Sequence, residues 1–104
     1  MLQAQSERME FPTSTILTPY NYREWKPMIL LHLRSKGLYP IVMGIETDQL
    51  SEDEKSNWLN KSDMSYGRLC LSMSCDILYD IINIESPHEI WTTLEGLYGD
   101  DNDL

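Results

Sequence analysis

Helix start and stop signals divide this sequence into short apolar segments, and they constrain the fold more than any other feature. The clearest start is Ser86-Pro87-His88-Glu89, with an N-cap serine, a proline at the first helical position and a glutamate at the third. The pattern predicts a helix that Gly99 ends. Its apolar side chains fall on one face: Ile90, Trp91, Leu94, Leu97 and Tyr98.

A second start lies at Ser51, where Glu54 completes a capping box and acidic residues 52–54 suit the positive end of a helix. This helix is predicted to run to about Met73. Gly67 is expected to weaken it midway and to allow a neighbouring element to approach closely. The predicted buried stripe follows spacings of three and four: Trp58, Ser62, Tyr66, Leu69 and Met73.

The first helix of the chain is predicted to have Asn21 as its N-cap and to stop at Gly37. Pro27 has no backbone N–H and belongs in a first turn. We therefore expect the helix to start at about Arg23, or to be preceded by a 3₁₀ turn. Its inward stripe is Trp25, Met28, Ile29 and Leu33.

Two shorter helices complete the pattern. Residues 38–44 form a short helix opened by Pro40 and closed by Gly44. A buried strand is the alternative for this segment because it contains β-branched residues, but a lone strand has nothing to pair with. Asp76 is predicted to cap the other short helix, from Ile77 to Ile82.

These elements predict an all-α fold, a small orthogonal bundle of about five helices in a single domain of 104 residues. Residues 1–18 are expected to form an extended N-terminal arm, residues 19–99 the helical domain and residues 100–104 an acidic tail. The predicted core consists of Trp25, Ile29, Leu33, Trp58, Leu69, Met73, Trp91, Leu94 and Tyr98.

The charge balance excludes several classes of partner. With 8 Lys and Arg against 17 Asp and Glu, the chain carries −9. Proteins grip phosphate with Lys and Arg, so we expect no direct nucleic-acid binding, and an anionic membrane surface would also repel the chain. The N-terminus has no signal-peptide pattern, and no apolar run approaches the roughly 20 residues of a membrane span. A cytoplasmic protein is expected, with the nucleus as the alternative.

No residue pattern predicts catalysis. Cys70 and Cys75 are five positions apart, unlike a zinc or redox pair, and we expect both to be buried small hydrophobes in a reduced protein. His32 is predicted to be a packed or half-exposed helix residue, and His88 an exposed first-turn residue. We therefore expect no catalytic residue, cofactor or metal. A small hydrolase or metal protein built on these four side chains is the weakest alternative.

Several stretches stand in an order and spacing typical of one family. They are Leu17–Lys26 (LTPYNYREWK), Lys36–Gly44 (KGLYPIVMG), Leu69–Ser74 (LCLSMS) and Glu85–Tyr98 (ESPHEIWTTLEGLY). Together they resemble the opening of copia-type retrotransposon Gag polypeptides. That family begins with a Leu-x-Gly-x-Asn-Tyr-x-x-Trp signature, and a later helix reads Ala-Lys-Glu-Ala-Trp-Asp-x-Leu-x-x-Tyr.

This resemblance implies an all-helical, capsid-like N-terminal domain whose full-length relatives self-assemble into particles that package RNA. In the family, a C-terminal zinc knuckle usually binds the RNA, and this motif is absent from the present sequence. The expected function is therefore structural, through weak self-association. The chain is either a piece of a longer polyprotein or a domesticated remnant. In the second case it would be a binding module, an adaptor or interference factor that recognises a host or viral protein or peptide.

Overall fold

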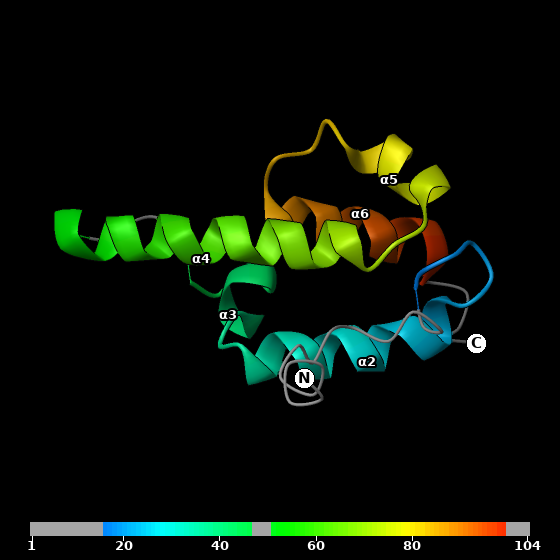
Figure 1. Cartoon of the computed structure of the whole chain (residues 1–104), viewed down its shortest axis with the longest axis horizontal. Coiled ribbons are helices and arrows are strands. Elements are labelled where there is room, and N and C mark those ends of the chain that lie inside the picture. The colour runs from blue at the N-terminus through cyan, green and yellow to red at the C-terminus, as the bar shows by residue number, and fades with distance from the viewer. Residues whose placement is uncertain (1–15, 47–50, 100–104) are drawn as a thin grey trace, which may run out of the picture.

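The computed structural model describes residues 16–46 and 51–99 of the chain. Within these ranges the backbone forms five helices and no strand, so the predicted small all-α bundle is confirmed (Figure 1). The predictions for residues 1–15 of the arm and for the acidic tail 100–104 lie outside the described residues. The helices are α2 (Tyr22–Ser35), α3 (Tyr39–Val42), α4 (Glu52–Leu71), α5 (Cys75–Ile81) and α6 (Pro87–Tyr98).

Helix α2 begins at Tyr22, one residue before the predicted start, and Pro27 lies inside it. The start agrees with the predicted Arg23 to within one residue, but the prediction that Pro27 lies in the first turn was wrong. The missing N–H of Pro27 deprives only the Arg23 carbonyl of a helical donor, and both residues are exposed to water. Asn21 occupies the N-cap position, but its side chain makes no capping bond. Instead its Oδ1 accepts a hydrogen bond from the Thr18 amide at 2.7 Å.

Glycines end both α2 and α3 in the same way. Gly37 and Gly44 have φ angles of 73° and 78°, in the left-handed region. After α2, the Leu38 amide donates to the Leu33 carbonyl at 2.9 Å, and after α3 the Ile45 amide donates to the Pro40 carbonyl at 2.8 Å. These are Schellman motifs, which satisfy carbonyls at the end of a helix. The stop signals at both glycines are therefore confirmed.

The end of the predicted arm is fixed to the bundle by a single parallel bridge between Leu17 and Met73. The Leu17 amide donates to the Ser72 carbonyl at 2.8 Å, and the Leu17 carbonyl accepts from the Ser74 amide at 2.9 Å. The indole N–H of Trp25 donates to the same Ser72 carbonyl at 3.0 Å. Two segments far apart in the sequence are therefore joined to α2 at one buried point.

The core lies where all five of the described helices meet. Trp25 is fully buried, and its ring centroid lies 5.8 Å from those of both Tyr22 and Trp91. Tyr98 is only partly buried but packs against this cluster. Seven of the nine residues expected in the core are buried: Trp25, Ile29, Leu33, Leu69, Met73, Trp91 and Leu94.

Trp58 is the correction to the predicted core. It is only half-buried, because the N-terminal half of α4 projects beyond the other helices (Figure 1) and leaves residues 52–57 exposed. In α4 only Ser65 and Leu69 are fully buried, so the predicted stripe was wrong over its first part. The predicted close approach at Gly67 is also wrong, since a Cβ there would meet no described atom within 4 Å.

The helix starts differ in how well the sequence predicted them. At α4, Ser51 and Glu54 form both bonds of the capping box. At α6, the Ser86 hydroxyl accepts from the Glu89 amide at 3.3 Å. At α5 the prediction was wrong, because the N-cap is Ser74 and Asp76 lies inside the first turn.

Candidate functional site

A groove of about 490 Å³ opens between the end of α3, the exposed half of α4 and the start of α6. We call it the α3–α4–α6 groove. Its size falls within the roughly 300–1,000 Å³ of typical ligand pockets. The lining residues are Ile41, Gly44, Glu46, Trp58, Leu59, Ser62, Asp63, Glu85, Ser86, Pro87 and His88.

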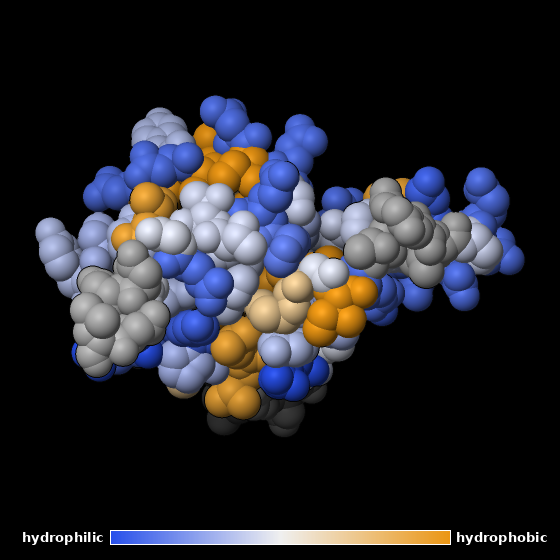
Figure 2. Space-filling view, turned by 180° about the vertical axis from the view of Figure 1, so that it is seen from behind, coloured by the Kyte–Doolittle hydropathy of each residue, from blue (hydrophilic) through white to orange (hydrophobic). Residues whose placement is uncertain are grey.

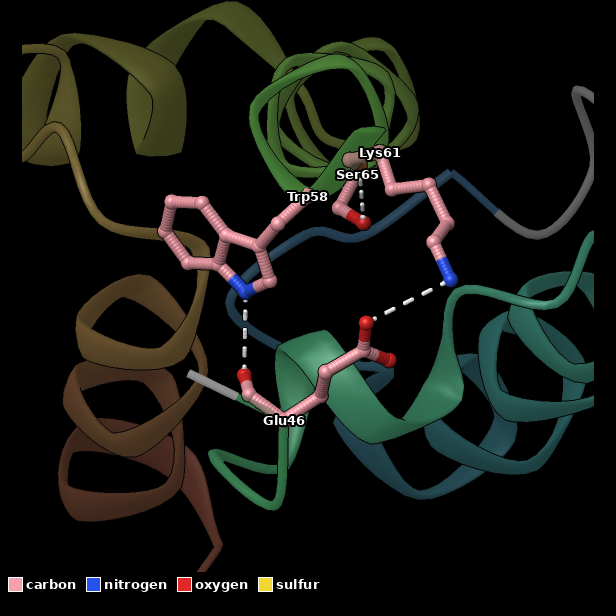
Figure 3. A network of polar contacts seen from close by, with 4 residues as sticks. All are labelled: Glu46, Trp58, Lys61 and Ser65. Atoms are coloured by element: carbon pink, nitrogen blue, oxygen red, sulfur yellow. Dashed lines mark hydrogen bonds and ion pairs between the residues drawn. The ribbon is translucent and has the colours of Figure 1, made fainter. Parts of the chain in front are cut away.

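The α4 wall of the groove is held to the segment after α3 by contacts that converge on Glu46 (Figure 3). The indole N–H of Trp58 donates to the Glu46 carbonyl at 3.1 Å. One turn along α4, the Lys61 ammonium lies 3.5 Å from the Glu46 carboxylate. The Ser65 hydroxyl donates back to the Lys61 carbonyl at 2.8 Å, which satisfies a polar group on the buried side of α4. Trp58 is therefore a wall of the groove rather than a core residue.

The α6 wall is held by His88, which comes from the first turn of that helix. Its Nδ1 lies 2.9 Å from the Val42 carbonyl oxygen. A carbonyl can only accept, so Nδ1 carries a proton and donates it to this oxygen. The ring also lies against Gly44, where an added Cβ would come within 2.9 Å of it. Glycine at position 44 therefore serves both the left-handed turn and the close packing of His88.

The lining is apolar on its walls and acidic at its edges. Hydrocarbon comes from Trp58, Leu59 and Pro87, whereas Asp63 and Glu85 are exposed carboxylates on opposite walls. None of the described residues that line the groove is a lysine or an arginine. Such a surface favours an apolar ligand that carries positive charge.

The side chains considered for chemistry lie on four different helices. His32 is half-buried on α2, with Nε2 3.4 Å from the Arg68 guanidinium. Cys70 on α4 is half-buried, and burial raises the pKa of its thiol, partly offset by a hydrogen bond from Tyr66. Cys75 opens α5 and is exposed, so its predicted burial was wrong; as the first helical residue it points away from the core. Within residues 16–46 and 51–99, no group of three or more His, Cys, Asp or Glu could hold a metal ion.

Large apolar side chains also remain exposed outside the groove. They lie on different elements, and on the face in Figure 2 they form separate orange areas over α2, over the turn after α3 and over α5. Leu71 and Tyr79 are each 81% exposed, and Leu31 is 64% exposed. The full set in the described residues is Tyr20, Met28, Leu31, Ile45, Leu59, Met64, Leu71, Tyr79, Ile82 and Leu97.

No family model, curated protein or solved structure matches the chain. The function is therefore argued from the sequence and from the fold and groove described above. None of the helices in the described part of the chain is both long and apolar enough to cross a bilayer.

The sequence did not predict the groove. Its parts come from three segments, and Glu46 contributes a backbone carbonyl, which no side-chain pattern reveals. One signal was available in retrospect: polar residues surround Trp58 on the first turns of α4, so little else on that part of the helix could be buried.

Proposed function

We propose that this chain is a structural domain that works by weak association with copies of itself, of the capsid-like kind found in copia-type Gag polypeptides. The sequence resemblance and the all-helical fold support the proposal. The resembling residues fall at structurally defined points: Trp25 and Trp91 pack together, and Gly37 forms the turn between α2 and α3.

The observation that carries the proposal is the distribution of exposed apolar side chains over separate elements. A two-fold dimer needs one self-complementary patch, whereas a lattice or shell needs at least two different contact surfaces. Leu31 on α2, Leu71 at the end of α4 and Tyr79 on α5 offer apolar surface in three places. Where such side chains gather into patches, as in the orange areas of Figure 2, the patches often mark interaction surfaces.

Net charge sets how strong such contacts are. Two copies that each carry −9 repel one another, which weakens association at low ionic strength. Salt screens that repulsion and leaves the apolar contacts in place. Association is therefore expected to strengthen as salt is added, the opposite of a contact built on ion pairs.

Sedimentation velocity across a range of protein and salt concentrations tests the proposal. We expect the weight-average sedimentation coefficient to rise with both, and Leu31→Ser, Leu71→Ser and Tyr79→Ser each to reduce the rise. Asn60→Ser on α4 changes an exposed, uncharged polar position without altering the net charge and serves as the control. A coefficient that stays at the monomer value at the highest concentration and salt would contradict self-association.

A second candidate function, a Gag-derived binding module for another protein, is favoured by the α3–α4–α6 groove. Helical domains commonly hold a partner segment in a groove between helices. The groove has a suitable volume, and hydrogen bonds from both Trp58 and His88 fix its walls. Binding of a peptide that shifts NMR signals of the groove residues tests this candidate, whereas sedimentation tests the first.

A further inference from the structure

We infer that the α3–α4–α6 groove binds a short cationic amphipathic segment of another protein, which inserts a large apolar side chain between the walls and places Lys or Arg on the acidic edges. The inference rests on the second proposed function and goes further by naming the chemistry of the partner.

The apolar half of the inference comes from the groove walls. Leu59 on α4 is 51% exposed, and residues 52–57, which precede it on the helix, are exposed as well. The indole N–H of Trp58 is occupied by the Glu46 carbonyl, so the ring offers hydrocarbon to a ligand. Pro87 borders the groove on the opposite wall but is itself buried, so the apolar area open to a ligand comes mainly from Leu59 and Trp58. Covering these side chains removes apolar area from water, which favours binding.

The cationic half comes from the edges of the groove. The charge of Glu46 is partly neutralised by Lys61, 3.5 Å away. Asp63 and Glu85 are exposed, and neither forms an ion pair with any residue in the described ranges. Since they lie on opposite walls, a ligand between them meets negative charge on both sides. Complementary charge steers a partner and selects against anions.

The same charge argument decides between possible occupants. Nucleic acids and phosphorylated peptides carry the sign of the groove edges and are disfavoured. A second copy of this chain carries −9, so it also approaches against repulsion. A Lys- or Arg-bearing segment with an apolar face satisfies both the walls and the edges, and such segments commonly bind as short helices in grooves.

NMR titration of the full chain with a short synthetic amphipathic peptide of leucine and lysine tests the inference. The indole N–H signal of Trp58 reports on the groove, and that of Trp25 reports on the core. We expect the Trp58 indole and the Gly44 amide to shift on binding, whereas the indole of Trp25, which is buried against Ser72, stays in place. A leucine–glutamate peptide and a serine–lysine peptide are expected to bind at least about tenfold more weakly, because each lacks one half of the complementarity.

Charge-reversal variants separate groove binding from general attraction to an acidic protein. The double variant Asp63→Lys/Glu85→Lys is expected to raise the dissociation constant of the leucine–lysine peptide about tenfold. Glu24→Lys/Asp76→Lys makes the same change in net charge at exposed positions outside the groove, and is expected to change the dissociation constant less than twofold. An unchanged Trp25 indole signal shows that both variants remain folded.

Three results would overturn the inference. They are equal weakening by both double variants, equal binding of the leucine–glutamate peptide, and shifts of the groove signals with protein concentration alone. The last would mean that a second copy occupies the groove. The first two results leave the sedimentation test untouched, and the third would itself be self-association, so failure of this inference is distinguishable from failure of self-association.

Discussion

The two ends of α4 differ in what holds them. At the C-terminal end, Leu69 is fully buried and Ser72 accepts hydrogen bonds from both Trp25 and the Leu17 amide. At the N-terminal end the helix projects, and Trp58 and Lys61 attach it to the rest through Glu46 (Figure 3). One region is fixed by burial and the other by a few polar contacts. The C-terminal end of α4 therefore contributes to the stability of the fold, whereas the N-terminal end is available for binding.

The largest expected effect that tests this contrast comes from the tryptophans. Trp25→Ala should lower the free energy of unfolding by about 3–5 kcal/mol, because it leaves a cavity and removes one of the two hydrogen bonds to the Ser72 carbonyl. Trp58→Ala should cost only about 1 kcal/mol, the scale of one exchanged hydrogen bond and a partly buried ring. Urea unfolding followed by far-UV circular dichroism measures both. Equal losses of unfolding free energy in the two variants would contradict the proposed difference between the two ends of α4.

Glycine substitutions give the next largest difference. Gly44→Ala should cost about 2–3 kcal/mol, because the left-handed conformation is strained for alanine and the new Cβ meets the His88 ring. Gly37→Ala is the matched control, with the same φ region but open space around the Cβ, and should cost about 1 kcal/mol. Thermal unfolding of the two variants decides the point. Identical losses would mean that the contact between position 44 and His88 contributes nothing.

The N-cap serines allow a smaller comparison between the same ends. Ser86→Ala removes a cap from a helix whose first turn contains the buried Pro87, and should cost about 1 kcal/mol of global stability. Ser51→Ala removes a capping box from the projecting end, where fraying is local, so the global loss should be below about 0.5 kcal/mol. Amide exchange should instead rise in the first turn of α4. A larger global loss at Ser51 than at Ser86 would contradict this view.

Tyr22 gives the smallest effect, which depends on pH. Burial, and to a lesser degree the charge of Glu95, raise the pKa of its hydroxyl to about 12. A group whose pKa is raised on folding favours the folded state in its protonated form. Its contribution is complete below the unfolded pKa of about 10 and is lost as pH rises towards 12.

The Tyr22 hydroxyl forms no hydrogen bond with any described residue, so Tyr22→Phe should leave stability at pH 7 unchanged or slightly higher. The variant should also lose less stability than the wild type between pH 9 and 11. Tyr20→Phe, at an exposed position, is the control and should behave as the wild type. A Tyr22→Phe protein with the wild-type alkaline profile would show that another group causes the loss.

Local signals in the sequence predicted the fold well. Ser51, Ser86, Gly37 and Gly44 act over a few residues, through caps and turns, and the structure places each as predicted. The prediction failed where the outcome depends on distant segments. Trp58 fits a helical stripe, but whether a stripe is buried depends on what packs against it, and the projecting end of α4 lacks such a partner among the described helices.

The candidate site was less accessible to sequence reasoning than the fold. The buried contact between Leu17 and Ser72 is made by backbone groups, as is the link from Trp58 to Glu46. Backbone groups are nearly the same at every position, so the sequence does not reveal which of them form these hydrogen bonds. His88 was predicted to be an exposed first-turn residue, and the structure adds that its ring binds the Val42 carbonyl.

Amide hydrogen exchange at low and at high protein concentration, with salt present, tests the central claim of association most directly. The account predicts that at high concentration protection increases around Leu31, Leu71 and Tyr79, where apolar side chains are exposed, while amides near Trp25 stay equally protected. Exchange that is identical at both concentrations over all of these segments would contradict an assembly function.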